Sequence, residues 1–233
     1  MNEQHSHCSC CGTPYAEKTW PRICQSCDHH QWHNPTPIAV LLQPVHDGGR
    51  IGILAPIRGI QPQQGQPGLV GGFQEAHDQS SEAAALREMQ EETGIDLTAS
   101  ADLYPICTRS TGPMIPGRRQ NLVFIANHET LDIKAFEQFE PNAETSAIHI
   151  AWESQALCFP SHSYALALWF KMQGQPTNEM LLDQPQVGDR VGMQNHIVNL
   201  PYHQPLCERG IWWADTAQGM MMLKRGARSW ILA

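Results

Sequence analysis

GGFQEAHDQSSEAAALREMQEETGI, residues 71–95, is the most informative stretch of the chain. Ser80 or Ser81 can cap the start of a helix, because a serine hydroxyl accepts a hydrogen bond from an N–H of the first turn. The alanines that follow favour a helix, and Gly94 can end it because glycine adopts the left-handed conformation without strain. The stretch therefore predicts a helix that begins at the serine pair and ends before Gly94.

Three carboxylates share one face of this predicted helix. Glu88, Glu91 and Glu92 fall within an arc of about 100°, because spacings of three and four residues meet on a helix surface. Such like charges repel by roughly 0.2–0.5 kcal/mol per pair. A hard divalent cation would remove that cost, and Arg87 can fix the rotamer of Glu91 four residues later. We therefore predict a cation site; a solvated acidic surface is the alternative.

These residues resemble the signature of the Nudix hydrolase family: Gly, five residues, Glu, seven residues, Arg-Glu, an apolar residue, any residue, Glu-Glu, any residue, Gly and an apolar residue. The second half of the signature is matched by Arg87, Glu88, Met89, Glu91, Glu92, Gly94 and Ile95. In the first half, Gln79 and Phe73 stand where the family has Glu and Gly. One inserted residue restores Gly72 to register and offers Asp78 as the acid.

The resemblance implies both a metal site and an activity. Glu88, Glu91 and Glu92 would bind Mg²⁺ or Mn²⁺. Arg87 would orient them, and the carbonyl of Gly72 would add a ligand. The implied reaction is metal-dependent hydrolysis of the pyrophosphate bond of a nucleoside-diphosphate-X substrate such as NADH, ADP-ribose or FAD. The product would be AMP or another nucleoside monophosphate, so the partner is a small nucleotide.

Residues outside the helix extend the predicted site. A glutamate on a later loop often supplies the general base or another metal ligand in this family, and Glu144 is the candidate here. Arg109, Arg118 and Arg119 could clamp phosphates or stack on an adenine ring, with ordinary surface charge as the alternative. Phe73, beside the glycine pair, is predicted to shape the floor of the substrate pocket.

Four cysteines predict a second metal site near the N-terminus. Cys8-x-x-Cys11 and Cys24-x-x-Cys27 are separated by twelve residues, a pattern typical of a tetrahedral zinc ribbon. Such a zinc has no open position and is structural. Disulfides, or a histidine in place of one cysteine, are the alternatives. A zinc ribbon before a Nudix signature further resembles the branch that holds NADH pyrophosphatase, and an ADP-ribose pyrophosphatase fits equally.

Apolar runs place further elements around the acidic helix. They predict strands at Ile38–Leu42, Ile51–Ala55, Leu103–Thr108, Leu122–Ala126 and Ile148–Trp152, and a helix at Ser163–Met172. The first two strands are expected to pair as a hairpin across the turn residues 46–49, and residues 109–119 are expected to form a basic, turn-rich loop. This order fits an α/β protein with a Nudix-type α/β/α sandwich and a mixed sheet.

The chain is predicted to contain three domains, which are a zinc ribbon at 1–34, a Nudix hydrolase domain at 35–173 and a small β domain at 179–233. Prolines stiffen the first junction at 34–37, and residues 173–178 read as a linker. The last domain resembles an SH3-like barrel. Its Trp212, Trp213 and Trp230 either fill a small core or stack on bases or a peptide.

Composition limits the partners. A net charge of −8 and a pI of about 5.8 argue against a general binder of nucleic acids or anionic membranes, which needs clustered Lys and Arg. The first residues lack a signal pattern, and the longest apolar stretch, Tyr164–Phe170, is too short to span a bilayer. A soluble cytoplasmic protein is expected, and the resemblance implies a homodimer. The alternative function is a nucleotide sensor or nucleic-acid binder on a Nudix scaffold, including an RNA cap-removing hydrolase.

Overall fold

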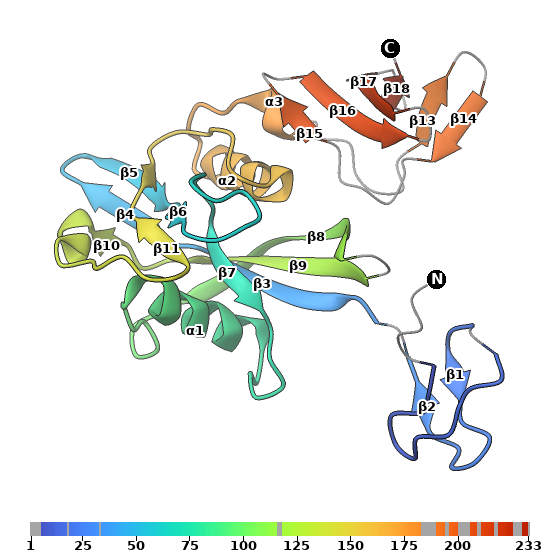
Figure 1. Ribbon diagram of the computed structural model, residues 1–233. Helices are drawn as coiled ribbons and strands as arrows, with labels where there is room; N and C mark the ends of the chain where they lie inside the picture. Colours follow the sequence, from blue (N-terminus) through green and yellow to red (C-terminus); the bar gives the residue numbers. More distant parts are fainter. Residues whose placement is uncertain are drawn as a thin grey trace. The chain divides into compact units, whose positions relative to one another are not determined.

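The structure is a computed structural model in which two compact units, 1–35 and 36–233, are distinguished. It describes residues 6–17, 19–32, 34–115, 118–182, 190–193, 196–199, 206–208, 211–216, 219–225 and 230–232, with side chains described outside 111–119 and 183–233. The first unit holds one small antiparallel sheet of two strands, β1 (Arg22–Ile23) and β2 (His30–Gln31). Figure 1 shows the elements of both units.

The sheet at the centre of the second unit is mixed, as predicted. Its strand order is β7 (Val70–Phe73), β3 (Thr36–Leu42), β9 (Arg118–Asn127) and β8 (Leu103–Ile115). Strands β3 and β9 are parallel, while β7 and β8 pair antiparallel with their neighbours. The parallel pair joins segments about 80 residues apart in the chain, so the sheet depends on long-range contacts.

A helix covers each face of this sheet, which gives an α/β/α sandwich (Figure 1). Along β3, Ala39 and Leu41 belong to the core under α1 (Ser81–Thr93), whereas Val40 and Leu42 belong to the core under α2 (Pro160–Met172). Successive side chains of a strand point to opposite sides of the sheet. Because all four of these residues are apolar, each face of the sheet carries an apolar core. The α/β fold class predicted from the sequence is thereby confirmed.

The bounds of α1 follow the predicted capping residues. The Ser80 side chain accepts a hydrogen bond from the Ala83 N–H at 3.2 Å, and Ala84 and Ala85 are fully buried against the sheet. At the other end, Gly94 has a φ of 78° and its N–H donates to the Gln90 carbonyl at 2.8 Å. The local signals were sufficient here because capping uses residues within one turn of the helix end.

The predicted hairpin between 38–42 and 51–55 is wrong. Strand β5 (Arg50–Leu54) pairs with β4 (Pro44–Asp47), and both belong to a second sheet with β10 (Leu131–Asp132) and β12 (Ile150–Ala151). The chain leaves the central sheet at Gln43. Its buried side chain donates to the Pro44 and Glu129 carbonyls, each at 2.8 Å. These hydrogen bonds fix Gln43 between β3 and β4, which the apolar pattern did not distinguish as two strands.

The predicted loop at 109–119 is also wrong over most of its length. Strand β8 continues to Ile115 and β9 begins at Arg118, with pairs such as Arg109–Leu122 and Ser110–Asn121. Glycine and proline in this stretch suggested turns, but the pairing register shifts between Thr111 and Ile115. An irregularity of this kind accommodates such residues without ending the strand.

Several short elements complete the described part of the second unit. They are β6 (Ile57–Arg58), which pairs with β11 (Thr145–Ala147), the 3₁₀ helix Ile133–Phe136 and α3 (Glu179–Leu182). A six-stranded sheet follows, with the order β14 (His196–Asn199), β13 (Arg190–Met193), β18 (Trp230–Leu232), β17 (Gly219–Arg225), β16 (Ile211–Thr216) and β15 (Leu206–Glu208). The tryptophan side chains predicted as core or stacking groups lie outside the described residues. In the described parts of the chain, none of the helices has the length and apolar character to cross a bilayer.

His162, in the first turn of α2, is a buried polar contact between the helix and the sheet. Its Nδ1 accepts a hydrogen bond from the Leu69 N–H at 3.1 Å, so the ring is neutral with its proton on Nε2. The rings of Phe124 and Phe159 contact it edge-on. Burial, assisted by the charge of Arg58, lowers the pKa of His162 to about 3.

This depressed pKa predicts sensitivity to acid. The unfolded chain binds a proton below about pH 6.5, whereas the folded chain stays neutral at this ring until about pH 3. The contribution of the neutral His162 to the free energy of unfolding is therefore complete above pH 6.5. It decreases as the pH falls, by about 2 kcal/mol between pH 6.5 and pH 5. Urea unfolding of wild type and His162→Gln across this range measures the difference. Identical pH slopes for the two proteins would contradict the assignment.

Candidate active site

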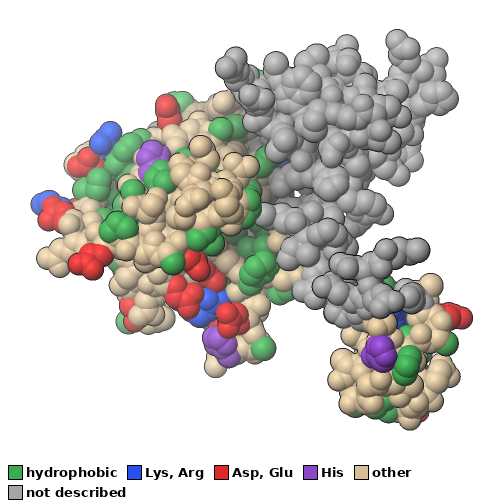
Figure 2. Space-filling view, viewed as in Figure 1, with side chains coloured by type: hydrophobic (Ala, Val, Ile, Leu, Met, Phe, Trp, Pro, Cys, Tyr) green, Lys and Arg blue, Asp and Glu red, His purple; other side chains and the backbone are tan. Residues whose placement is uncertain are grey.

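A cavity of about 330 Å³ lies where β7, the end of β6 and α1 meet the chain segment before β11. Its charged lining residues are Arg58, Glu75, Arg87, Glu88, Glu91, Glu92 and Glu144. Figure 2 shows acidic side chains gathered around a basic one on this face. Carboxylates outnumber guanidinium groups here, so the cavity attracts cations. A cation bound among these carboxylates would in turn attract phosphate groups.

Three of these carboxylates converge. Glu88, Glu92 and Glu144 each offer one oxygen, and the three oxygens lie within 4.8 Å of one another. Two come from one helix face and the third from a segment about fifty residues later. Hard divalent cations take clustered carboxylate oxygens of this kind as ligands, so the residues present fit Mg²⁺ or Mn²⁺.

Arg87 organises the carboxylates without facing a ligand itself. Its Nη1 donates to Glu88 at 2.9 Å and to Glu91 at 2.7 Å. Its Nε and Nη2 donate to the two oxygens of Asp78 at 3.2 and 3.1 Å, and Nη2 also donates to the Phe73 carbonyl at 2.9 Å. These five hydrogen bonds equal the five N–H donors of an arginine side chain.

Asp78 is the acid that faces Arg87 from the loop before the helix. Its carboxylate also accepts from the Glu75 N–H at 2.7 Å, and the hydrogen bonds from Arg87 lower its pKa. Gln79 is exposed and makes no such contact among the described residues. The insertion that the sequence required in the first half of the signature therefore corresponds to a loop in which Asp78 is the partner of Arg87.

The glycine pair leaves room for the carboxylates. A Cβ on Gly72 would lie 2.5–2.7 Å from the carboxylate atoms of Glu88, so any other residue would displace that group. Gly71 has a φ of 152°, and a Cβ there would collide with the Ala39 carbonyl on β3. Its N–H donates to Glu92 at 2.9 Å. Glycine at 72 therefore lets β7 and α1 approach closely enough to place the Glu88 carboxylate in the cavity, and glycine at 71 lets β7 pack against β3 while its N–H reaches Glu92.

Burial makes these carboxylates reluctant to ionise without a cation. It raises the pKa of Glu92 to about 8, although the hydrogen bond from the Gly71 N–H opposes the shift, and the charges of Glu88 and Glu144 add to it. Burial also raises the pKa of Glu88, against the effect of Arg87. Neighbouring carboxylates with raised pKa values are typical of sites that a metal ion neutralises.

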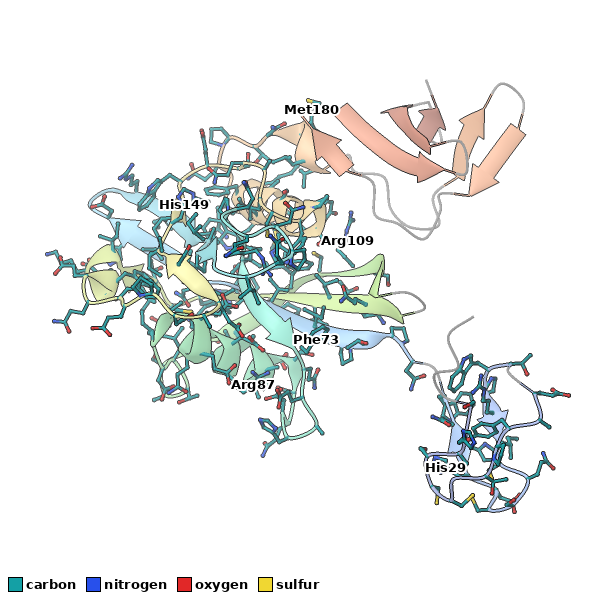
Figure 3. All side chains as sticks on the ribbon, in the orientation of Figure 1. His29, Phe73, Arg87, Arg109, His149 and Met180 are labelled. Carbon is teal, nitrogen blue, oxygen red and sulfur yellow. The ribbon has the colours of Figure 1, made fainter. Side chains whose placement is uncertain are left out.

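The predicted site residues are placed differently from one another. Phe73 lines the cavity and is half exposed. Glu91 lines it too, but is exposed and held by Arg87, and the carboxylate cluster does not include it. Arg109 is buried on the other side of the sheet, with its guanidinium 3.8 Å from the ring centroid of Tyr164 on α2 (Figure 3). The side chains of Arg118 and Arg119 lie outside the described residues.

Arg58 is a lining residue that sequence reasoning missed. It ends β6, and its Nε donates to the Pro62 carbonyl at 2.9 Å while the guanidinium packs over Phe159. Its two Nη groups have no hydrogen-bond or ion-pair partner among the described residues. The available signal was a single arginine at the end of an apolar strand, before a loop rich in Pro, Gln and Gly.

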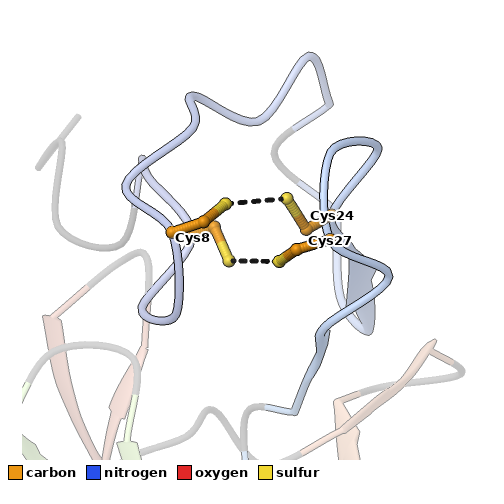
Figure 4. A group of neighbouring side chains, drawn as sticks. Cys8, Cys24 and Cys27 are labelled. Atoms are coloured by element: carbon orange, nitrogen blue, oxygen red, sulfur yellow. Dashed lines mark hydrogen bonds between the residues drawn. The ribbon is translucent and has the colours of Figure 1, made fainter.

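The four predicted cysteines come together in the first unit. Sγ of Cys8 lies 3.7 Å from that of Cys27, and Sγ of Cys11 lies 3.5 Å from that of Cys24 (Figure 4). All four sulfur atoms lie within 4.8 Å of one another. The described cysteines are free, which is against the disulfide alternative. The cluster contains no histidine from the described residues.

The two cysteine turns repeat one geometry. In each, the N–H two residues after the first cysteine donates to its sulfur at 3.4 Å, from Cys10 and from Ser26. The residue after the second cysteine has a positive φ, 75° at Gly12 and 53° at Asp28. Hydrogen bonds from Thr13 lower the pKa of Cys11 to about 6. Paired turns that direct N–H groups at thiolates fit a tetrahedral zinc ion.

A family model described as "NUDIX domain" matches residues 35–156, which is more than half of the chain. The chain belongs to the Nudix family. The matched range contains the cavity, the glycine pair and all three clustered carboxylates, so this Nudix chain is a pyrophosphohydrolase of its family. A search of curated proteins found no match.

Solved structures of Nudix proteins resemble this chain. A NUDIX hydrolase from Nitrosomonas europaea is 20% identical, with 74% of this chain and 95% of that chain covered and a TM-score of 0.48. A MutT/nudix family protein from Enterococcus faecalis is 16% identical, with 66% and 69% covered and a TM-score of 0.48. The NUDIX domain of Shewanella oneidensis NrtR, solved with ADP ribose, is 15% identical, with 64% and 82% covered and a TM-score of 0.42.

Proposed function

We propose that this protein hydrolyses the pyrophosphate bond of a nucleoside-diphosphate-X substrate, such as NADH, ADP-ribose or FAD, and releases AMP or another nucleoside monophosphate. The observation that carries the proposal is the convergence of Glu88, Glu92 and Glu144 in one cavity. When bound to these carboxylates, Mg²⁺ or Mn²⁺ would neutralise phosphate oxygens and lower the pKa of a water molecule.

The residues of the chain have separate roles in this proposal. Glu88, Glu92 and one oxygen of Glu144 hold the cation, and Arg87 with Gly72 fixes where the Glu88 oxygens lie. Glu144 is exposed at the cavity, so its carboxylate can accept a proton from the attacking water. Glu91 keeps Arg87 in place. The exposed side chain of Phe73 offers an apolar surface to the nucleoside or to X.

A substrate panel tests the proposal. The protein is incubated with NADH, ADP-ribose, FAD and diadenosine polyphosphates in Mg²⁺ or Mn²⁺, and products are identified by mass spectrometry in ¹⁸O-labelled water. We expect AMP from at least one substrate, with the label on a phosphate product. If none of these substrates is cleaved, the proposal is wrong.

The homodimer and the cytoplasmic location stay predictions.

Arg58 is proposed to bind a phosphate of the substrate, because it lines the cavity and its Nη groups have no hydrogen-bond or ion-pair partner in the part of the chain that the structure describes. We expect Arg58→Met to raise KM by about 10- to 100-fold, the loss of one or two charge-assisted hydrogen bonds. The same change should tighten Mn²⁺ binding, since it removes a positive charge near Glu92.

Arg50→Met is the matched control for this prediction. Arg50 is an exposed arginine on β5 that pairs with Asp47 and stacks on Trp152, and it does not line the cavity of Glu88, Glu92 and Glu144. Its loss should change neither KM nor Mn²⁺ affinity. If Arg58→Met and Arg50→Met behave alike in steady-state kinetics and in Mn²⁺ titration, Arg58 does not bind the substrate.

A further inference from the structure

The side-chain amide of Asn142, two residues before Glu144, forms hydrogen bonds through both its nitrogen and its oxygen. Asn142 Nδ2 donates to two carbonyls in the last turn of α1, those of Glu91 at 3.2 Å and Glu92 at 3.0 Å. Its Oδ1 accepts from the N–H groups of Glu144 at 2.9 Å and Thr145 at 2.8 Å. One residue therefore connects the backbone of the helix that bears Glu92 to the backbone of Glu144.

The helix end explains why an amide suits this position. The last carbonyls of a helix have no partner within the helix and carry a partial negative charge. A donor satisfies them, whereas a carboxylate would repel them. Among uncharged side chains, only those of Asn and Gln supply two N–H donors for the two carbonyls together with one oxygen that accepts from both loop N–H groups. Gln would place its amide one methylene farther away.

Glu144 depends on its backbone for its position. Its exposed carboxylate has no hydrogen bond or ion pair to any described residue, yet an oxygen of it lies within 4.8 Å of oxygens of Glu88 and Glu92. On the other side of the segment, the Gly59 N–H donates to the Glu144 carbonyl at 2.6 Å. The peptide groups of Glu144 are thus fixed by Asn142 on one side and by Gly59, the residue after β6, on the other.

We propose that Asn142 is the positioning residue that holds Glu144 in register with Glu88 and Glu92, and so sets both the affinity of the cation site and the rate of the reaction. Asn142 touches neither substrate nor cation. It acts through Glu144. Where turnover is concerned, the inference rests on the proposed function; where cation binding is concerned, it stands on the carboxylate cluster alone.

The variants separate the two halves of the contact. Asn142→Ala removes both. Asn142→Asp keeps the acceptor for the loop N–H groups but replaces the donor with an oxygen that faces the Glu91 and Glu92 carbonyls. If connection to α1 is what matters, the aspartate variant should be as impaired as the alanine variant. Glu140→Gln is the control, since Glu140 is an exposed carboxylate two residues earlier.

The experiment measures Mn²⁺ binding to the full chain by electron paramagnetic resonance of the free ion, together with kcat and KM on a substrate cleaved in the panel. We expect Asn142→Ala and Asn142→Asp to weaken Mn²⁺ binding about 10-fold and to lower kcat about 10- to 100-fold with little change in KM, the range of effects for groups that orient metal ligands. Glu140→Gln should match wild type.

A double variant tests whether Asn142 acts through Glu144. In a Glu144→Gln background, Asn142→Ala should cause no further loss of Mn²⁺ affinity or kcat, because the residue it positions is already changed. Effects that multiply would overturn the proposal, as would a wild-type Mn²⁺ affinity in Asn142→Ala or full activity in Asn142→Asp. A wild-type protein that binds Mn²⁺ but cleaves nothing would defeat the proposed function, and the Mn²⁺ measurements would still decide the role of Asn142.

Discussion

Glu92→Gln should lower kcat by about 10³-fold and, in the absence of metal, make the protein more stable. The loss of activity follows because an amide is a poor ligand for a hard cation, and a change of about 4 kcal/mol in the barrier corresponds to this factor. The side chain keeps its shape, and its amide oxygen can still accept from the Gly71 N–H. Steady-state kinetics on the best substrate measures the first effect.

The gain in stability follows from the raised pKa of Glu92. Between about pH 4.5 and pH 8 the folded state holds a proton that the unfolded state releases, so wild-type stability falls as the pH rises through this window. Glutamine has no proton to lose. In chelator, we therefore expect no difference at pH 4 and a gain of about 1–3 kcal/mol for the variant at pH 8, measured by urea unfolding.

Glu82→Gln is the control on the same helix, because Glu82 is exposed in the first turn and outside the cavity. It should leave both kcat and the pH dependence of stability unchanged. An active Glu92→Gln protein would contradict the metal site. A variant that is inactive but no more stable at pH 8 would instead contradict the buried, cation-dependent state of this carboxylate.

Removal of the metal from the cysteine cluster should unfold the first unit and leave the second folded. We propose that this metal is zinc. Zinc supplies about 10 kcal/mol or more of apparent stability to small sites of this type, and about thirty residues cannot build a sufficient hydrophobic core without it. The second unit has two apolar cores of its own, one on each face of its central sheet.

Hydrogen exchange and metal analysis measure this effect. Wild type should contain one zinc per chain, and Cys24→Ser should contain none and lose amide protection throughout 6–32, while the strands and helices between 36 and 182 keep theirs. Cys10→Ser is the matched control, because Cys10 is an exposed thiol in the same turn that does not belong to the cluster. Retention of zinc by Cys24→Ser would refute the assignment.

Local features of the fold were predictable from the sequence, and long-range features were not. The bounds of α1 depend on Ser80 and Gly94, which act within one turn of the helix ends. The pairing of β3 with β9 joins distant segments, and the residues of neither strand indicate which other strand it will pair with. The false hairpin between 38–42 and 51–55 arose because apolar alternation does not show where a buried Gln43 turns the chain into another sheet.

The same limit applies to the candidate site. Helical spacing put Glu88, Glu91 and Glu92 on one face, but spacing does not show that Arg87 holds Glu91 outside the cluster. Glu144 could be suggested only by resemblance. Asn142 was not singled out at all, because its role depends on a helix end about fifty residues away that the sequence does not place beside it.

The saturation of Arg87 has a consequence for engineering the enzyme. Because all five N–H groups of Arg87 donate to other residues of the protein, none is left to donate to a substrate. A lysine at this position could not form the same five hydrogen bonds. Libraries aimed at altered nucleotide selectivity should therefore leave α1 untouched and randomise the rim, where Ile60 and Phe73 are exposed. Selectivity and catalytic competence would then be adjustable separately.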